Sequence, residues 1–264
     1  MFIIDQNSCT QCEACVEECP CGAVTLENNT IVHDSQKCMW CGHCLALCPC
    51  DAIMIDGDGY SVDDVEDFQF SKRASVAQIR RDIMMRRSVR SFNDTPVTED
   101  ELAKILEAAK YAPTAKNCQQ NALKVLNDPE EIDQLLEDCM EEIGKASKIV
   151  AKDNPEVGAF LMRKYGEFKE EGIDGLFYGA PLVILVFSNS DIDGALCGAA
   201  MGEMIEALKL GFCYIQLAAA PMNTPELRAK YNIPEDKHCV FGMAIGNYDA
   251  NYFSSVPRKP LPLL

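Results

Sequence analysis

Two runs of cysteine near the start of the chain constrain its fold more than any other feature. The runs are Cys9-x2-Cys12-x2-Cys15-x3-Cys19-Pro20 and Cys38-x2-Cys41-x2-Cys44-x3-Cys48-Pro49. The alternative is a zinc site or plain structural thiols. A structural zinc site, however, needs pairs of ligands separated by a longer loop. Three cysteines at two-residue intervals, a fourth three residues later and then proline form an iron–sulfur ligand pattern. The spacing therefore predicts two iron–sulfur clusters.

In this spacing, residues 1–60 resemble the bacterial ferredoxins that hold two [4Fe–4S] clusters. The resemblance implies that the fourth cysteine of each run reaches across to the cluster of the other run. One cluster is then held by Cys9, Cys12, Cys15 and Cys48, and the other by Cys38, Cys41, Cys44 and Cys19. We predict a ferredoxin-like domain over residues 1–60.

The cysteine runs lie inside a longer duplication with an offset of 29 residues, in which Asp5 recurs as Asp34 and Ala23 as Ala52. Short apolar stretches flank each run and predict strands over residues 2–4, 24–26, 31–32 and 53–55. Cys21 and Cys50 also recur, and we interpret them as small residues packed beside the clusters. Because sixty residues bury little surface, the clusters must supply much of the folding free energy.

Composition limits the partners and the compartment. The 264-residue chain carries a net charge of −17, and its first 60 residues hold nine acidic residues against one basic residue, Lys37. This charge argues against nucleic acid and suits a basic redox protein, or simply a solvated surface. The cysteine number is odd, 15, and no signal peptide pattern is present, so we expect a reducing cytoplasm. The longest strongly apolar run, residues 182–187, is too short to span a bilayer, and no membrane is expected.

An acidic stretch separates the two parts of the chain. Residues 51–67 are rich in Asp and Glu, with Gly57 and Gly59 among them. The stretch lacks the alternating oxygen ligands of a calcium loop. We predict an acidic linker over residues 61–74.

From residue 75 the hydrophobic period becomes helical. Ser75 can cap a helix over residues 76–86, and a capping box at residues 98–101 can open a second helix. The expected apolar sides are Val76, Ile79, Ile83 and Met84 in the first helix and Leu102, Ile105, Leu106 and Ala109 in the second. Further strands are expected at 122–127, 181–187, 212–217 and 240–245, and helices at 192–210 and 225–231. The helix over 192–210 is rich in small residues, which allow close backbone approach.

Two motifs stand at the ends of the first two helices. They are Arg86-Arg87-Ser88-Val89-Arg90-Ser91-Phe92 and Ala112-Pro113-Thr114-Ala115-Lys116-Asn117-Cys118-Gln119. A basic surface turn could explain the first motif alone, although forked guanidinium donors and a hydroxyl can also hold a phosphate. Together the motifs resemble the entry to the nitroreductase family of FMN flavoproteins, and the resemblance covers residues 75–264. The predicted fold class is α+β, with the ferredoxin-like domain followed by a nitroreductase-like FMN domain.

The resemblance implies an FMN site shared by two protomers. Its phosphate would be held by Arg86 and Ser88 with the less certain Arg87, and closed by Gly246, Arg258 and Lys259. Arg90 would approach the flavin pyrimidine edge or the ribityl chain, and the isoalloxazine would pack on Pro113, Thr114, Asn117 and Gln119. The family commonly has Gln-Pro-Trp where this chain has Gln119-Gln120-Asn121. A proline at position 221, which lacks an N–H, leaves the contact to flavin N5 unassigned.

The remaining histidines, Trp40 and the other cysteines are interpreted as structural residues. His33, His43 and His238 show no mutual spacing of a metal site, and Trp40 is expected to shield the second cluster. The cysteines outside the runs and the two CPC repeats are expected to be small core residues, namely Cys118, Cys139, Cys197, Cys213 and Cys239.

The sequence therefore predicts an FMN-dependent oxidoreductase in which the flavin, and no side chain, does the chemistry. Electrons would pass between the two [4Fe–4S] clusters and FMN to reduce a small electrophile such as a nitroaromatic or a quinone. The expected partners are a ferredoxin, another redox protein or NAD(P)H, and a second copy of the chain in a homodimer. One alternative is an electron-transfer or redox-sensing module with a protein partner and no small substrate. Another is a different chemistry of the same fold, such as reductive dehalogenation or flavin fragmentation.

Overall fold

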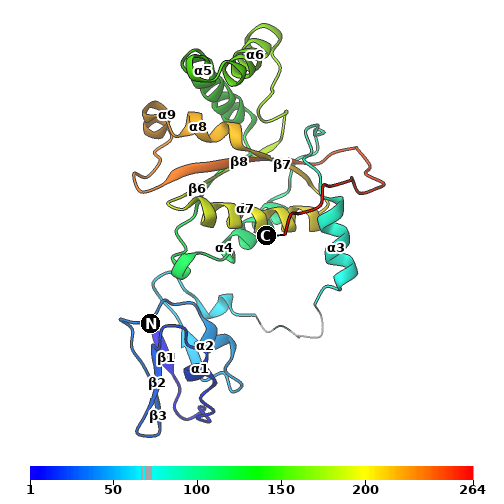
Figure 1. Cartoon of the computed structure of the whole chain (residues 1–264). Helices are drawn as coiled ribbons and strands as arrows, with labels where there is room; N and C mark the ends of the chain where they lie inside the picture. Colours follow the sequence, from blue (N-terminus) through cyan, green and yellow to red (C-terminus); the bar gives the residue numbers. More distant parts are fainter. Residues whose placement is uncertain (67, 69–72, 264) are drawn as a thin grey trace. The chain divides into compact units, whose positions relative to one another are not determined.

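The computed structural model describes residues 1–66, 68 and 73–263, and these form two compact units (Figure 1). The first unit comprises Met1–Ala74 and Ala115–Cys118, and the second comprises Ser75–Thr114 and Gln119–Leu264. The predicted linker, residues 61–74, lies partly outside the described residues, because 67 and 69–72 are not among them. Its described part includes a short 3-10 helix, η1 (Val62–Asp64), which Ser61 caps. The predicted domain boundaries stay a prediction.

The first unit is built from two small antiparallel strand pairs and two one-turn helices. Strand β1 (Phe2–Ile4) pairs with β4 (Ile53–Ile55), and β2 (Val24–Glu27) pairs with β3 (Thr30–His33). The turn between β2 and β3 consists of Asn28 and Asn29, both left-handed, which suits the twist of a two-residue hairpin. Helices α1 (Ala14–Glu17) and α2 (His43–Ala46) lie inside the two cysteine runs.

The sequence duplication is also a duplication of backbone conformation. Left-handed residues occur at equivalent positions, 29 residues apart: φ is 56° at Gln11 and 57° at Trp40, and 62° at Glu13 and 74° at Gly42. A non-glycine residue pays a conformational cost at such angles, so the surrounding loop must impose them. The two cysteine loops therefore share one shape.

The two halves of the first unit are joined by reciprocal hydrogen bonds. The N–H of Asp5 donates to the carbonyl of Ala52, and the N–H of Asp34 donates to the carbonyl of Ala23, both over 2.8 Å. Each half thus completes the other, and neither can bury its own strand ends alone. The buried apolar side chains among the described residues of this unit are few, namely Ala23, Val24, Ile31, Ala52, Ile53 and Ile55.

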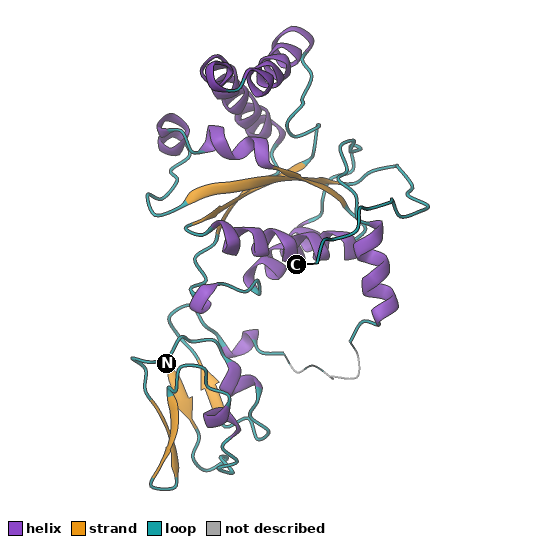
Figure 2. Ribbon diagram, viewed as in Figure 1, coloured by secondary structure: helices purple, strands orange, loops and turns teal. Residues whose placement is uncertain are grey.

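The second unit is an antiparallel four-stranded sheet with helices on both faces (Figure 2). Its strands run in the order β5 (Ala122–Leu126), β6 (Leu182–Ser188), β8 (His238–Gly246) and β7 (Gly211–Ile215). Every residue of β6 is buried, because β6 is an inner strand with both faces covered. Its side chains alternate between the two cores, with Val183, Leu185 and Phe187 in one and Leu182, Ile184 and Val186 in the other.

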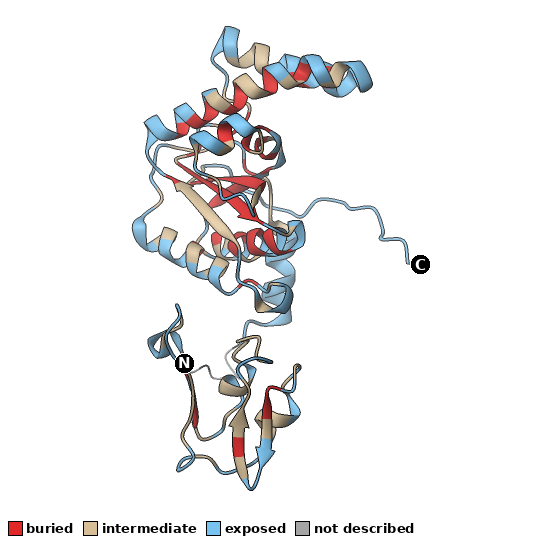
Figure 3. Cartoon of the chain, turned by 90° about the vertical axis from the view of Figure 1, so that its left-hand side faces the viewer, coloured by how far each residue is buried: buried red, intermediate tan, exposed pale blue. Residues whose placement is uncertain are grey.

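Two groups of helices cover the sheet of the second unit. One face carries α5 (Pro129–Asp153), α6 (Pro155–Glu171), α8 (Ala219–Met222) and α9 (Pro225–Lys230). The other carries α4 (Glu99–Lys110) and α7 (Asp191–Ala207). Figure 3 shows the buried residues concentrated in the strands and on the helix sides that face them. No helix among the described residues is long and apolar enough to cross a membrane.

The small residues of α7 serve close packing within the chain. A Cβ placed on Gly198 would lie 2.2 Å from Cζ of Phe241, and one on Gly202 would lie 2.6 Å from the hydroxyl of Tyr214. These glycines therefore let α7 rest directly on β7 and β8. The expected close backbone approach is present, and the sheet is its partner.

Several expectations need correction. Helix α3 (Val76–Met85) forms with Ser75 as its cap and ends one residue before the expected Arg86. Its apolar side chains are exposed in this chain, at 85% for Val76 and 71% for Ile83. Helices α5 and α6 lie outside the predicted elements. The strand expected over 212–217 ends at Ile215, where η4 (Gln216–Ala218) follows. Cys118 is exposed, whereas the other four cysteines expected in the core are buried.

Candidate cofactor sites

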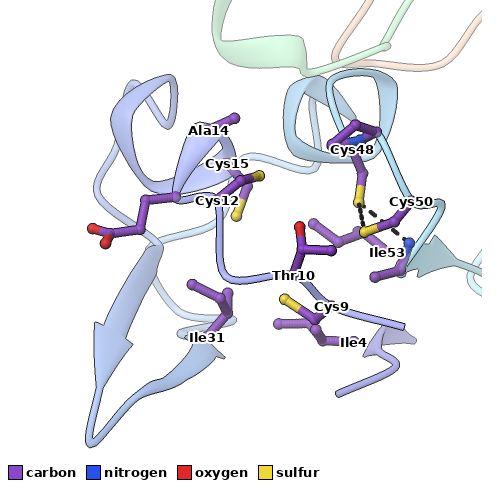
Figure 4. A pocket seen from close by; sticks show the side chains of 13 residues that line it. Ile4, Cys9, Thr10, Cys12, Ala14, Cys15, Ile31, Cys48, Cys50 and Ile53 are labelled. Carbon is purple, nitrogen blue, oxygen red and sulfur yellow. Dashed lines mark hydrogen bonds between the residues drawn. The ribbon is translucent and has the colours of Figure 1, made fainter. Parts of the chain in front are cut away.

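Four cysteines from both runs surround one cavity of the first unit (Figure 4). They are Cys9, Cys12, Cys15 and Cys48. The cavity encloses about 340 Å³, part of it open to solvent, and apolar residues such as Ile4, Ile31 and Ile53 complete its wall. Sulfur ligands within an apolar shell are the donor set that an iron–sulfur cluster requires.

The second cavity repeats the first. It also encloses about 340 Å³, and its cysteines include Cys19, Cys38, Cys41 and Cys44. Each cavity thus takes three cysteines from one run and the fourth from the other. The fold brings together the two ligand sets that the ferredoxin resemblance implies.

Burial and hydrogen bonding prepare these sulfurs in different ways. Burial raises the pKa of the Cys15 and Cys38 thiols, and that of Cys44 to about 11. These thiols stay protonated until a metal displaces the proton, so iron binding would release protons.

Backbone N–H groups point at three of the sulfurs. Ala23 donates to Sγ of Cys19 and Ala52 to Sγ of Cys48, each over 3.2 Å, and Trp40 donates to Sγ of Cys38 over 3.3 Å. Such donors stabilise negative charge on sulfur. The residues therefore fit a group with thiolate ligands.

An aromatic cluster borders the second cavity. Trp40 and His43 line the cavity itself, as expected for Trp40. The ring of Trp40 stacks with Tyr60 at a centroid distance of 6.1 Å and meets the edge of His33, which in turn stacks on Phe2 at 3.8 Å. In the first half of the duplication, Gln11 occupies the position of Trp40. The second cavity therefore has an aromatic wall at a position where the first half has a polar residue.

The segment Ala115–Cys118, which contains the 3-10 turn η3 (Ala115–Asn117), belongs to the first unit. The side-chain amide of Asn117 donates to the carbonyls of Trp40, over 2.9 Å, and Met39, over 3.3 Å. Both carbonyls lie in the loop between the cavity cysteines Cys38 and Cys41. A residue predicted for the flavin thus contacts a cysteine loop.

In the second unit, the predicted phosphate residues lie beside β7. The N–H of Val89 donates to the carbonyl of Phe212 over 2.9 Å, and Ser88 forms a parallel bridge with the same residue. The guanidinium of Arg86 lies 5.9 Å from the centre of the Phe212 ring. Its Nη1 is buried, and among the described residues it has no hydrogen-bond partner. A buried donor of this kind fits an anionic group.

The neighbouring arginines are used differently. Arg87 donates to the carbonyls of Met84, Arg86 and Ser254 over 2.7 to 2.9 Å, so its guanidinium ties the end of α3 to the C-terminal segment. Arg90 lies over the ring of Tyr178 at 5.8 Å.

The three residues predicted to close the phosphate site differ in their positions and surroundings. Gly246 ends β8, where a Cβ would lie 2.6 Å from Cδ of Pro181, so packing alone requires a glycine there. Arg258 and Lys259 are exposed beyond β8.

A third cavity, in the second unit, encloses about 620 Å³ including open solvent. Thr114 and Gln119 of the predicted site line it, and the N–H of Gln119 donates to Oγ1 of Thr114 over 3.0 Å. Pro113, between Ala112 and Thr114 of this lining, is exposed. The sequence did not single out Asn121 as a site residue, although its Oδ1 is buried, without a partner among the described residues, in the wall of this cavity. The departure from Gln-Pro-Trp distinguishes position 121 in the sequence, but it does not indicate that Asn121 places an acceptor in the wall of a cavity.

Both units match known families. Residues 83–247, more than half of the chain, match the model of the nitroreductase family, and residues 1–49 match that of a 4Fe-4S dicluster domain. The chain therefore belongs to the nitroreductase family and carries a 4Fe-4S dicluster domain. It is an oxidoreductase of that family.

Individual proteins agree with this assignment. The FMN reductase (NADPH) of Bacillus subtilis is 26% identical over 189 residues, which cover 67% of this chain and 68% of the relative. A nitroreductase with bound FMN from Bacteroides fragilis has a TM-score of 0.59 and 20% identity, over 71% of this chain and 98% of that one. An FMN-dependent nitroreductase from Clostridium difficile has a TM-score of 0.54 and 20% identity, over 70% and 99%. The predicted family and α+β fold class are confirmed, and the predicted cofactor classes agree with both family matches.

Proposed function

We propose that the protein is an FMN-dependent reductase in which two [4Fe–4S] clusters exchange electrons with the flavin. The observation that carries the proposal is the pair of cavities, each of which brings together four cysteines of the two runs, in a chain that belongs to the nitroreductase family. Clusters exchange single electrons, whereas a flavin can combine two of them for reaction with an organic acceptor. The combination suits reduction of a small electrophile, such as a nitroaromatic or a quinone.

The residues of the chain would bind and orient both groups. The eight cysteines hold the clusters, and the apolar walls of the cavities limit access of water to them. In the second unit, Arg86 supplies a buried donor for the FMN phosphate. Thr114, Gln119 and the free acceptor of Asn121 bind the ring system.

The position of Asn117 in the chain bears on which cluster we assign to the exchange of electrons with FMN. Asn117 is tied to Met39 and Trp40 in the loop of the second cluster. Thr114, only three residues earlier, lines the cavity assigned to the flavin ring. Asn117 and Thr114 are three residues apart in the sequence, and on this adjacency we propose the cluster of Cys19, Cys38, Cys41 and Cys44 as the one that exchanges electrons with FMN.

Donor, assembly and compartment are part of the same proposal. The relative named FMN reductase (NADPH) makes NAD(P)H a candidate donor, and the acidic surface of residues 1–60 favours a basic redox protein or a ferredoxin docked by a basic patch. A homodimer would bring the phosphate residues of one protomer to the ring residues of its partner. The exposed apolar side of α3 is available for such an interface. Reduced cysteine ligands favour the cytoplasm as the compartment.

The test is anaerobic purification with analysis of iron, sulfide and flavin, followed by turnover with nitroaromatic and quinone acceptors. We expect about eight irons and one FMN per chain, and bleaching of the flavin when a reduced ferredoxin or NAD(P)H is added. A protein with fewer than about four irons, or without FMN, would refute the proposal.

The acidic charge of residues 1–60 also favours a second candidate, an electron-transfer or redox-sensing module with no small substrate. In that case the reduced protein would pass electrons to a protein partner and fail with every small acceptor. Turnover of one small acceptor at a rate above that of free reduced flavin decides for the enzyme.

A further inference from the structure

Two cysteines that are extra to the ligand count occupy equivalent positions of the duplication. Cys21 lies two residues after Cys19, and Cys50 lies two residues after Cys48. The Sγ atoms of Cys19 and Cys21 are 3.8 Å apart, and those of Cys48 and Cys50 are 3.7 Å apart (Figure 4 shows the latter pair). Each extra cysteine lines the same cavity as its neighbour.

We propose that Cys21 and Cys50 donate S–H hydrogen bonds to the ligand sulfurs beside them, and that each raises the reduction potential of one cluster. The proposal rests on the assignment of the eight cysteines as ligands. Because of the crossed ligand sets, Cys21 acts on the cluster of the second cavity and Cys50 on the cluster of the first.

The direction of the hydrogen bond follows from iron binding. A cysteine bound to iron is a thiolate, which can only accept, so the extra cysteine must be the donor. The same sulfur accepts a second hydrogen bond from a backbone N–H, that of Ala23 for Cys19 and that of Ala52 for Cys48. Each crossing ligand thus has two donors.

The local turn explains why the thiol lies there. The N–H of Gly22 donates to the carbonyl of Cys19, and the N–H of Asp51 donates to that of Cys48. Both donors are left-handed residues, with φ of 61° and 50°. The turn brings the third side chain back toward the first. The second residue is proline, which has no N–H to offer, so the thiol and the later alanine N–H are the donors.

The sign of the effect follows from charge. Reduction adds an electron to the cluster and increases the negative charge on its ligand sulfurs. A hydrogen bond to such a sulfur therefore stabilises the reduced state more than the oxidised state, and its loss lowers the potential.

The experiment is an anaerobic redox titration of the full-length holoprotein, in which electron paramagnetic resonance distinguishes the two reduced clusters. The variant Cys21→Ala should lower the potential of one cluster, and Cys50→Ala should lower that of the other. Each should change the equilibrium constant for electron transfer between the clusters about three- to tenfold, in opposite directions. This change corresponds to roughly 30–60 mV for a one-electron couple.

The two variants control for one another, and Cys21→Ser and Cys50→Ser keep a donor of similar size. The serine variants should hold the potentials at or above those of the original protein. The proposal is overturned if alanine leaves both potentials unchanged, if either variant shifts both clusters equally, or if serine behaves as alanine does. Iron analysis of the unsubstituted protein comes first, because absent clusters refute the proposed function, whereas intact clusters without a shift refute only this inference.

A second measurement decides the matter if the alanine variants lose iron. The infrared S–H stretch of the unsubstituted holoprotein should contain bands moved to lower wavenumber by hydrogen bonding. Cys21→Ser and Cys50→Ser should each remove one of them. Loss of an unshifted band instead would overturn the proposal.

Discussion

The two units obtain their stability in different ways. The second unit packs two cores against a sheet whose strand β6 is buried along its whole length. The first unit has six buried apolar side chains among its described residues, two of them alanines, and it is organised around two cavities lined by cysteine. Hydrophobic burial can hold the second unit, whereas the first is incomplete until its cavities are filled.

Removal of iron should have the largest effect and should separate the two units. After anaerobic oxidation and chelation, we expect the first unit to unfold completely, because it loses the group that joins its two halves. The second unit should keep its fold. Hydrogen exchange followed by mass spectrometry checks this: amides of residues 1–60 should lose protection, and those of β6 should not.

Reconstitution of the same sample with iron and sulfide is the control, since it should restore protection. If residues 1–60 stay protected without iron, burial alone holds the first unit and the comparison fails.

Overpacking of α7 should give the next largest effect, confined to the second unit. In Gly198→Ala the new methyl group would lie 2.2 Å from the ring of Phe241, which is itself held edge-on by Tyr214. We expect a loss of about 1–3 kcal/mol in the free energy of unfolding of the second unit. Denaturant titration followed by circular dichroism measures it, while the visible absorbance of the clusters should keep its own midpoint.

A matched substitution exists in α6. A Cβ on Gly166 would meet nothing within 4 Å, so Gly166→Ala should stabilise the second unit by about 0.5–1 kcal/mol through helix propensity alone. If the two alanine variants are equally stable, close packing of α7 is not what requires Gly198.

Substitution of Arg86 should weaken FMN binding and leave the first unit unchanged. The buried Nη1 has no partner among the described residues, so Arg86→Gln would remove a charged donor from the proposed phosphate site. We expect FMN to bind about ten- to a hundredfold less tightly, as for loss of a hydrogen bond to a charged group. Flavin fluorescence titration gives the affinity, and iron content reports on the clusters.

The control for this substitution is Arg163→Gln, which removes an exposed arginine paired with Glu167 in α6. It should change neither FMN affinity nor iron content, because surface ion pairs contribute little. Loss of clusters in Arg86→Gln would mean that the two units do not bind their cofactors independently.

How far the sequence predicts the molecule also differs between the units. In the first unit, the cysteine spacing indicated two iron–sulfur sites, because iron–sulfur ligation constrains both the residue type and the interval, and the resemblance to ferredoxins implied which cysteines share a cavity. In the second unit, the strands were predictable from apolar runs such as residues 182–187, which need no partner information. Helices α5 and α6 also carry an amphipathic pattern, which indicates a helix without partner information.

The missed features depend on contacts between distant parts of the chain. No local pattern could show that Asn117 donates to the carbonyl of Trp40, 77 residues away. The free acceptor of Asn121 is likewise a property of the folded cavity. The apolar side chains of α3 recur at the spacing of a buried face, yet they are exposed in this chain. Periodicity shows that a helix has an apolar face, but it does not show what covers that face.

The pH dependence of the first unit should be the smallest effect, and it concerns His33. This ring stacks on Phe2 and meets the edge of Trp40, and its Nε2 is buried without a hydrogen-bond partner among the described residues. Burial lowers the pKa of His33 from its ordinary value of 6.5, while the nearby Asp34 opposes the shift. The unfolded chain therefore takes up a proton more readily than the folded one.

Stability of the first unit should thus be complete above pH 6.5 and should fall as the pH drops through 6.5 toward the lower pKa of the folded state. The loss should stay below about 1 kcal/mol, because the ring is only half-buried and water screens its charge. Anaerobic denaturant titrations between pH 5 and 8, followed by cluster absorbance, measure it. His33→Phe keeps a ring to stack on Phe2 but cannot titrate, so its remaining pH dependence belongs to other groups. If stability depends on pH equally in the unsubstituted protein and in His33→Phe, the ring of His33 is solvated in both the folded and the unfolded state, and the aromatic cluster does not exclude water.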